Sequence, residues 1–257
     1  MNYRVGAVGA ITQGQIDALV SEAAAALPDT DLGWSWAFDG TRIDLCAELP
    51  PVPHPTHRGA LLATGAVLLN LRALIRGLGV HSSVRLQPDP NRADLVATIR
   101  LEGPRAVTDQ DRSLVSAVLA GPRERGVVGN TTSPAALIVA VRKAAKLEQA
   151  WLAVQPLTSV FGAINGAGEQ SAGTALIIGT VLDGLGAQLQ AGQAAQRVVL
   201  TAAMMDQPVS PLRIVLQSNG NRRAVRELIG GGLWPQAVFG LPTNGQRSLD
   251  NGIARAD

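Results

Sequence analysis

Two long apolar segments, half the chain apart, constrain the fold of this protein more than any other feature of its sequence. Residues 65–71 (GAVLLNL) resemble residues 192–198 (GQAAQRV), and the two glycines are 127 residues apart in a chain of 257. Each segment lies in a stretch whose apolar residues repeat at helical spacing, Gly59 to Leu78 and Ala187 to Met205. The offset predicts two related halves that each pair a long helix with a sheet, and chance similarity of two apolar helices is the alternative.

The composition favours a compact protein with closely packed helices. Hydrophobic residues make up 46% of the chain, which is enough for one large domain or two fused halves, and aromatic residues are only 3%, so small aliphatic side chains fill the core. The net charge is +2 and no run of Lys or Arg is present, so nucleic acid is not an expected partner. The apolar stretches are too short for a membrane span, and the N-terminus lacks an unbroken apolar signal, which predicts a soluble cytoplasmic protein.

Residues that carry metal or nucleophilic chemistry are few. The single cysteine, Cys46, lies in an alternating apolar segment and is expected to be a small core residue. His54, His57 and His81 have no carboxylate or cysteine at ligand spacing, so no metal site is predicted. No set of acid, base and nucleophile stands out, and no catalytic side chain is assigned.

Local signals predict most of the helices and strands. Thr12 and Thr108 are expected to cap helices over 12–27 and 108–119, and Asp39-Gly40 is a hairpin turn between two alternating segments. After position 80, strands are predicted at 83–86, 95–101, 174–181, 213–216 and 234–241, of which 174–181 is expected to be buried and central. Helices are predicted at 135–152 and 221–229, and a mobile Gly-rich loop at 156–173.

A series of short motifs points to a known family. The motifs, in chain order, are Trp36-Ala37-Phe38-Asp39-Gly40, Gly65-Ala66-Val67-Leu68-Leu69-Asn70-Leu71-Arg72, Val84-Arg85-Leu86-Gln87-Pro88, Gly192-Gln193-Ala194-Ala195-Gln196-Arg197-Val198, Ser210-Pro211-Leu212 and Gly240-Leu241-Pro242. In order and spacing they resemble the Acg-type nitroreductase-like proteins of actinobacteria, over residues 34–242.

The resemblance implies an α+β, nitroreductase-like fold in which two related halves, residues 1–120 and 121–257, imitate the nitroreductase homodimer. It implies FMN in the cleft between the halves and an oxidoreductase that uses NAD(P)H as the second nucleotide partner. In such proteins the flavin supplies the hydride chemistry, and the protein positions it. A monomer acting as a pseudo-dimer would suffice, and a homodimer is the alternative.

The candidate cofactor-binding residues follow from the same resemblance. Arg123, Arg125 and Arg247 stand where the family binds the flavin phosphate, a task that suits the planar guanidinium fork. The alternative is that they are solvated surface arginines. The segment Ser210-Pro211-Leu212 is the candidate contact with the flavin ring, or else a turn that ends the preceding helix. Trp34 and Trp36 either line the pocket or belong to the core.

Departures from the family pattern support a second hypothesis. Asp29 and Asp31 lie in the segment where the family has an asparagine and a glutamine near the flavin, and the region 155–173 is shorter than in the family. These changes favour a non-enzymatic descendant that sequesters flavin or another small ligand, or that serves as a partner-binding module.

Overall fold

The computed structural model describes seven stretches of the chain: residues 11–27, 33–47, 55–121, 133–165, 173–207, 209–216 and 218–241. They form an α+β structure with two four-stranded antiparallel sheets. The helices are α1 (Gln13–Ala25), α2 (Pro55–Gly77), α3 (Asp109–Ala120), α4 (Pro134–Leu147), α5 (Leu157–Asn165), α6 (Leu185–Met204), the 3-10 helix η1 (Arg213–Leu216) and α7 (Asn219–Leu228). The strands are β1 (Trp34–Phe38), β2 (Arg42–Ala47), β3 (Val80–Leu86), β4 (Leu95–Pro104), β5 (Trp151–Pro156), β6 (Thr174–Thr180), β7 (Ser210–Pro211) and β8 (Trp234–Leu241).

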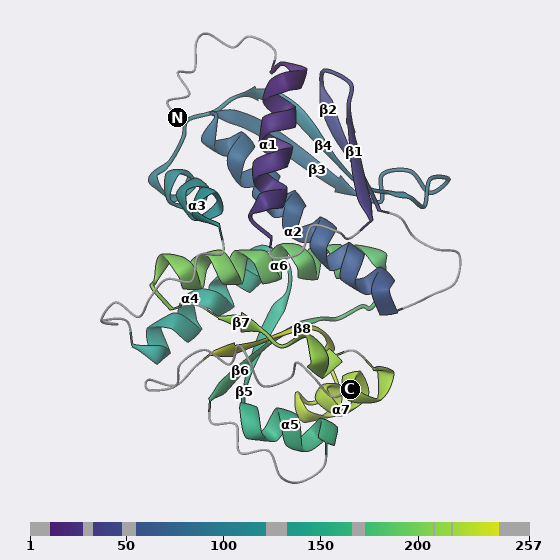
Figure 1. Ribbon diagram of the computed structural model, residues 1–257, viewed down its shortest axis with the longest axis vertical. Helices are drawn as coiled ribbons and strands as arrows, with labels where there is room; N and C mark the ends of the chain where they lie inside the picture. The colour runs from purple at the N-terminus through teal and green to yellow at the C-terminus, as the bar shows by residue number, and fades with distance from the viewer. Residues whose placement is uncertain are drawn as a thin grey trace, which may run out of the picture.

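The two sheets have the same connectivity. Their strand orders are β1-β2-β4-β3 and β5-β6-β8-β7, and every pairing is antiparallel. In chain order, α2 connects β2 to β3 and α6 connects β6 to β7, so each long helix follows the second strand of its sheet. Figure 1 shows the first sheet in the upper part of the molecule and the second in the lower part, with α2 and α6 crossing between them.

Helices α2 and α6 pack against each other more extensively than any other pair of elements in the described residues. At their crossing, a Cβ on Gly65 would overlap the carbonyl oxygen of Leu189 and lie 3.0 Å from the Cα of Gly192. A Cβ on Gly192 would in turn overlap the carbonyl oxygen of Leu62. Leu62 and Leu189 each lie three residues before the glycine of their own helix, so the contact is reciprocal, as in an isologous interface.

The two sheets are covered differently. Exposed and less exposed residues alternate along β1 and β3, so one face of the first sheet lies towards solvent. Strand β6 is buried on both faces: Leu176 and Ile178 join the core cluster beneath α4 and α6, whereas Ala175 and Ile177 join the cluster beneath α5 and α7. This confirms the buried central strand that the apolar run after position 173 predicts.

Several local predictions are confirmed. Thr12 and Thr108 accept backbone hydrogen bonds as the N-caps of α1 and α3, each in a capping box. The hairpin at Asp39-Gly40 joins β1 to β2. Trp34 and Trp36 pack against the core cluster that the first sheet forms with α1, α2 and α3, which matches the core alternative for these two side chains.

Three predictions near the middle and end of the chain are wrong. The helix expected over 135–152 ends at Leu147, because the chain turns at Gln149 and continues as β5. The loop expected at 156–173 contains helix α5, whose residues Leu157 and Val160 are fully buried. The strand expected at 213–216 is the 3-10 helix η1. In the first two cases tertiary burial decides the structure in a segment with weak local signals.

Helix α2 is the one helix of the described residues that is long and apolar enough to cross a membrane, from Arg58 to Gly77. Most of this stretch is buried inside the protein, against α1, α3 and α6. This position is that of a core helix and is consistent with a soluble protein.

Candidate functional site

The sequence-predicted site residues are only partly placed by the structure. Arg123, Arg125 and Arg247 lie outside the described residues. Ser210 and Pro211 form β7 and pair with Gly240 and Phe239 at the edge of the second sheet. Leu212 donates its backbone N–H to the carbonyl of Val238 at 2.8 Å and packs its side chain against the core cluster beneath α5 and α7. The segment Ser210-Pro211-Leu212 is therefore part of the sheet edge.

A cavity of about 420 Å³ lies where four segments from the two halves of the chain meet. These segments are the end of β3, the turn between α4 and β5, the loop between β6 and α6, and the first turns of α6. The lining residues are Leu86, Gln149, Trp151, Thr180, Val181, Leu182, Gly186, Ala187 and Gln190. The volume falls within the range of small-molecule sites.

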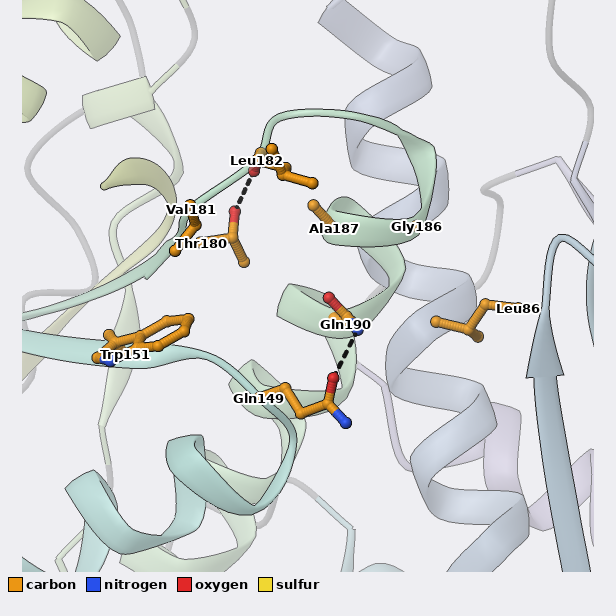
Figure 2. A pocket seen from close by; sticks show the side chains of 9 residues that line it. All are labelled: Leu86, Gln149, Trp151, Thr180, Val181, Leu182, Gly186, Ala187 and Gln190. Atoms are coloured by element: carbon orange, nitrogen blue, oxygen red, sulfur yellow. Dashed lines mark hydrogen bonds between the residues drawn. The ribbon is translucent and has the colours of Figure 1, made fainter. Parts of the chain in front are cut away.

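The walls of the cavity are mostly apolar. Figure 2 shows Leu86 and Trp151 on opposite sides of the cavity, with Gln149 and Gln190 between them. Trp151, Val181 and Leu182 are 49%, 55% and 71% exposed, values that are unusual for large apolar side chains and that place them at an open rim. An apolar ligand in the cavity would cover these side chains.

The polar side chains of the lining differ in how many of their hydrogen-bonding groups have a partner. Thr180 donates its hydroxyl to the carbonyl of Leu182 at 2.7 Å and accepts from Gln236 at 2.9 Å. Gln190 donates Nε2 to Oε1 of Gln149 at 3.1 Å. Within the described residues, Nε2 of Gln149 and Oε1 of Gln190 have no partner, so the amide pair offers a ligand one donor group and one acceptor.

Gln149 holds its place in the cavity at a conformational cost. Its φ is 58°, in the left-handed region, where a residue with a side chain is disfavoured. The N–H of Gln149 donates to Lys146 and that of Ala150 to Ala145, the bonding pattern that ends a helix and that usually has glycine at this position. Strained residues of this kind concentrate at functional sites. The position therefore supports a role for the Gln149 side chain itself.

A network of charged and amide side chains supports the loop between β6 and α6. Asp183 accepts both guanidinium arms of Arg222, at 2.9 and 2.5 Å, and a hydrogen bond from Gln236 at 2.9 Å. Arg58, from the start of α2, donates to the side chain and backbone carbonyl of Gln236 and to the carbonyl of Pro235. Burial and the neighbouring charge of Arg222 lower the pKa of Arg58 to about 10. The network joins the first half of the chain to the second beside the cavity.

Asp183 predicts an acid-dependent loss of stability. Burial raises the pKa of Asp183, but hydrogen bonds from Arg222 and Gln236 and the charges of Arg222 and Arg58 lower it by more, so that it lies below its ordinary value of 3.8. Because the pKa of Asp183 is lower in the folded than in the unfolded protein, its ionised form stabilises the fold at pH values above the unfolded-state pKa. This stabilisation is lost as the pH falls through the folded-state pKa. The difference in unfolding free energy between the wild type and Asp183→Asn should shrink below about pH 4. An equal difference at about pH 3 and pH 6, from urea titrations, would contradict this.

A second network lies on the other side of the cavity. Glu148, which is 7% exposed, precedes Gln149 and accepts from Arg72 of α2 and Arg197 of α6, each at 2.7 Å. Arg72 also donates to Oε1 of Gln193 at 2.5 Å, one helical turn beyond Gln190. Both carboxylate oxygens of Glu148 are thus engaged. The network fixes the turn that presents Gln149.

The lining residues were not predicted from the sequence. Gln149 and Trp151 fall inside the segment expected to be helical, because the turn at position 149 lacks the glycine that marks a helix end. The signal that was available is the unusual density of glutamine, at Gln188, Gln190, Gln193 and Gln196, on a mostly apolar helix. In the described part of the chain, no three His, Cys, Asp or Glu side chains gather as a metal site would require.

Comparisons with known proteins add no assignment. A scan against protein-family models finds no match, and a search of curated proteins finds no relative of this chain.

Proposed function

We propose that this protein binds FMN, with the flavin ring in the cavity beside Gln149 and Gln190, and acts as a nitroreductase-like oxidoreductase that uses NAD(P)H. The observation that carries the proposal is the cavity itself. Residues of the second half line it together with Leu86 of the first half, its walls are mostly apolar, and its amide pair has a donor and an acceptor without a partner among the described residues. A flat heteroaromatic ring with one polar edge matches these features.

The cavity lining fits the two faces and the edge of a flavin ring. Leu86 and Trp151 provide apolar surface on opposite sides, and an indole stacks well on a flat ring. The pyrimidine end of a flavin carries an N–H flanked by two carbonyls. Nε2 of Gln149 would donate to such a carbonyl, and Oε1 of Gln190 would accept from the N–H.

The chain's own residues position and shield the ring. A bound flavin supplies hydride transfer, which requires no acid or base from the protein. Trp151, Val181 and Leu182 form the open rim, so the ring would cover their apolar surface and exclude water from it. The networks at Glu148 and Asp183 hold the two loops that carry the lining.

The same proposal includes the finer description of the fold, a nitroreductase-like pseudo-dimer in the cytoplasm. The repeated strand order of the two sheets supports it, as does the reciprocal contact between Gly65 and Leu189 and between Gly192 and Leu62. An interface in which two equivalent surfaces contact each other reciprocally is that of a two-fold dimer. The contribution of Leu86 to a cavity of the second half then corresponds to a site that one subunit completes for the other.

A second candidate function, flavin sequestration without redox activity, is favoured by one observation. The described lining contains no charged residue, and Arg72, which donates to Gln193 one helical turn from Gln190, is already paired with Glu148. A cation near the pyrimidine end of a flavin tunes the ring towards its reduced, anionic form. Its absence from the lining favours a protein that holds oxidised flavin.

Reconstitution tests both candidates. The purified chain is incubated with FMN, desalted, and examined by visible absorbance before and after addition of NADH or NADPH without oxygen. Yellow protein that NAD(P)H bleaches supports the oxidoreductase, and yellow protein that only dithionite bleaches supports sequestration. A preparation that retains no flavin and shows no binding in a fluorescence titration would rule out both.

Substitution of Gln149 by glycine separates folding from binding. Because glycine relieves the left-handed conformation, the unfolding free energy is expected to rise by up to about 1 kcal/mol. Flavin affinity should fall about tenfold, since one hydrogen bond and the alignment of Gln190 are lost. Asp206 is the matched control, because it is also left-handed, at the end of α6 and outside the lining. Equal flavin affinity in Gln149→Gly and Asp206→Gly would refute the role of the amide.

A further inference from the structure

Four arginines gather where the end of α2 meets α3 and α6. Arg72 and Arg76 are one helical turn apart on α2 and therefore share a face. Arg105 follows β4 and lies beside the end of α2, because its backbone N–H donates to the carbonyl of Gly79 at 2.7 Å. Arg197 comes from α6 and shares the carboxylate of Glu148 with Arg72. We name this set the arginine cluster.

Two carboxylates neutralise only part of the arginine cluster. Glu148 pairs with Arg72 and Arg197, and Asp111 pairs with Arg105 at 3.1 Å. The guanidinium of the remaining arginine, Arg76, has no hydrogen-bond or carboxylate partner within the described residues. Its charge therefore faces three like charges without an anion of its own.

The environment of Arg76 is unfavourable for a cation. Burial lowers the pKa of Arg76, the charges of Arg72, Arg105 and Arg197 lower it further, and Asp111 opposes them. A half-buried guanidinium without a partner is costly unless an anion joins it. Four arginines and two carboxylates leave a net charge of +2 in the cluster.

We propose that the arginine cluster binds a phosphate dianion, free or as a phosphomonoester, with Arg76 as its principal ligand. A phosphate group carries close to two negative charges at neutral pH, which matches the excess of the cluster. Its oxygens accept the paired hydrogen bonds that planar guanidinium groups donate. A carboxylate would neutralise only half of the excess charge. The site stands apart from the residues that line the cavity, and its existence does not depend on flavin binding.

Inorganic phosphate is the first probe, added to the full chain at constant ionic strength. Isothermal titration should detect binding to the wild type, and binding to Arg76→Gln should be at least about tenfold weaker, because hydrogen bonds to charged groups are lost. Arg112→Gln is the matched control, since Arg112 forms an exposed pair with Asp109 on the adjacent helix α3. Absence of binding to the wild type, or equal binding to Arg76→Gln, would overturn the proposal.

Thermal unfolding separates a ligand residue from a structural one. Without phosphate, Arg76→Gln should unfold at the same temperature as the wild type or a higher one, because like-charge repulsion is removed. With phosphate, the wild type alone should gain stability. Arg76 also lies in the last turn of α2, where a cation favours the helix dipole. If that were its only role, Arg76→Gln would unfold at a lower temperature in both conditions.

Competition identifies the source of the phosphate. If phosphate displaces FMN and leaves riboflavin binding unchanged, the cluster holds the phosphate of the nucleotide. If phosphate binds at the cluster and displaces neither compound, the site takes free phosphate or another phosphomonoester. Both results support the site. Loss of riboflavin and FMN binding alike in Arg76→Gln would contradict it, since riboflavin has no phosphate.

Discussion

Replacing Gly192 by alanine is expected to lower the free energy of unfolding by about 3 kcal/mol, the upper part of the range for overpacked sites. The new Cβ would lie 2.8 and 2.9 Å from the carbonyl carbon and Cα of Leu62 and would overlap its carbonyl oxygen. These are helix backbone atoms, which cannot rotate away as the end of a side chain does. The helices would have to separate, and α2 and α6 form the most extensive contact in the described structure.

Urea titration followed by circular dichroism measures this effect, with Gly59→Ala as the matched control. Gly59 is also in a long helix, α2, but an added Cβ there meets nothing within 4 Å. Alanine has the better helix propensity, so Gly59→Ala is expected to stabilise by about 0.5–1 kcal/mol. If Gly192→Ala and Gly59→Ala shift stability in the same direction, the close approach of the helices is not required.

The partner substitution, Gly65→Ala, should behave in the same way, because the contact is reciprocal. The two changes are not expected to be additive, since both act on one spacing between two helices. Once Gly192→Ala has separated the helices, Gly65→Ala should add less than its effect alone. An additive double variant would show that the two glycines contribute independently.

Replacing Glu148 by alanine is expected to lower the free energy of unfolding by about 3–5 kcal/mol, the effect of removing one partner from a buried ion pair. Glu148 is 7% exposed and engages Arg72 and Arg197, whose side chains are 19% and 11% exposed. Without the carboxylate, two largely buried guanidinium groups lose their counter-charge. Their repulsion adds to that of Arg76 and Arg105.

The control for Glu148→Ala is Asp109→Ala. Asp109 also pairs with an arginine, Arg112, at 2.7 Å, but the two side chains are 98% and 63% exposed. Exposed pairs contribute about 1 kcal/mol or less, so this variant should remain close to the wild type. Denaturant titrations at low and moderate salt compare the two. Similar losses of stability in both variants would show that the buried position of Glu148 has no special importance.

Local sequence was sufficient for the elements whose signals lie within a few neighbouring residues. The capping boxes at Thr12 and Thr108 and the hairpin at Asp39-Gly40 are of this kind. The long helices α2 and α6 were also predictable, because a helical repeat of apolar residues extends over several turns in each.

Tertiary contacts were needed where the local signal was weak or misleading. The end of α4 is hidden because Gln149, a residue with a side chain, occupies a left-handed position that usually has glycine. The segment of α5 is expected to be a loop from its sequence, because it contains glycine. In the structure it is helical because its residues Leu157 and Val160 are buried in the core. The α+β class, which the family resemblance implies, is nevertheless the class of the structure.

The sequence alone determined the α+β class and the two paired helices, with Gly65 and Gly192 placed half the chain apart. It could not determine that these glycines meet each other, that Glu148 joins α2 to α6, or that Leu86, Trp151 and Gln190 line one cavity. Those arrangements depend on residues far apart in the chain, whose side chains carry no local pattern. They exist only because the packing of α2 on α6 brings the two halves together.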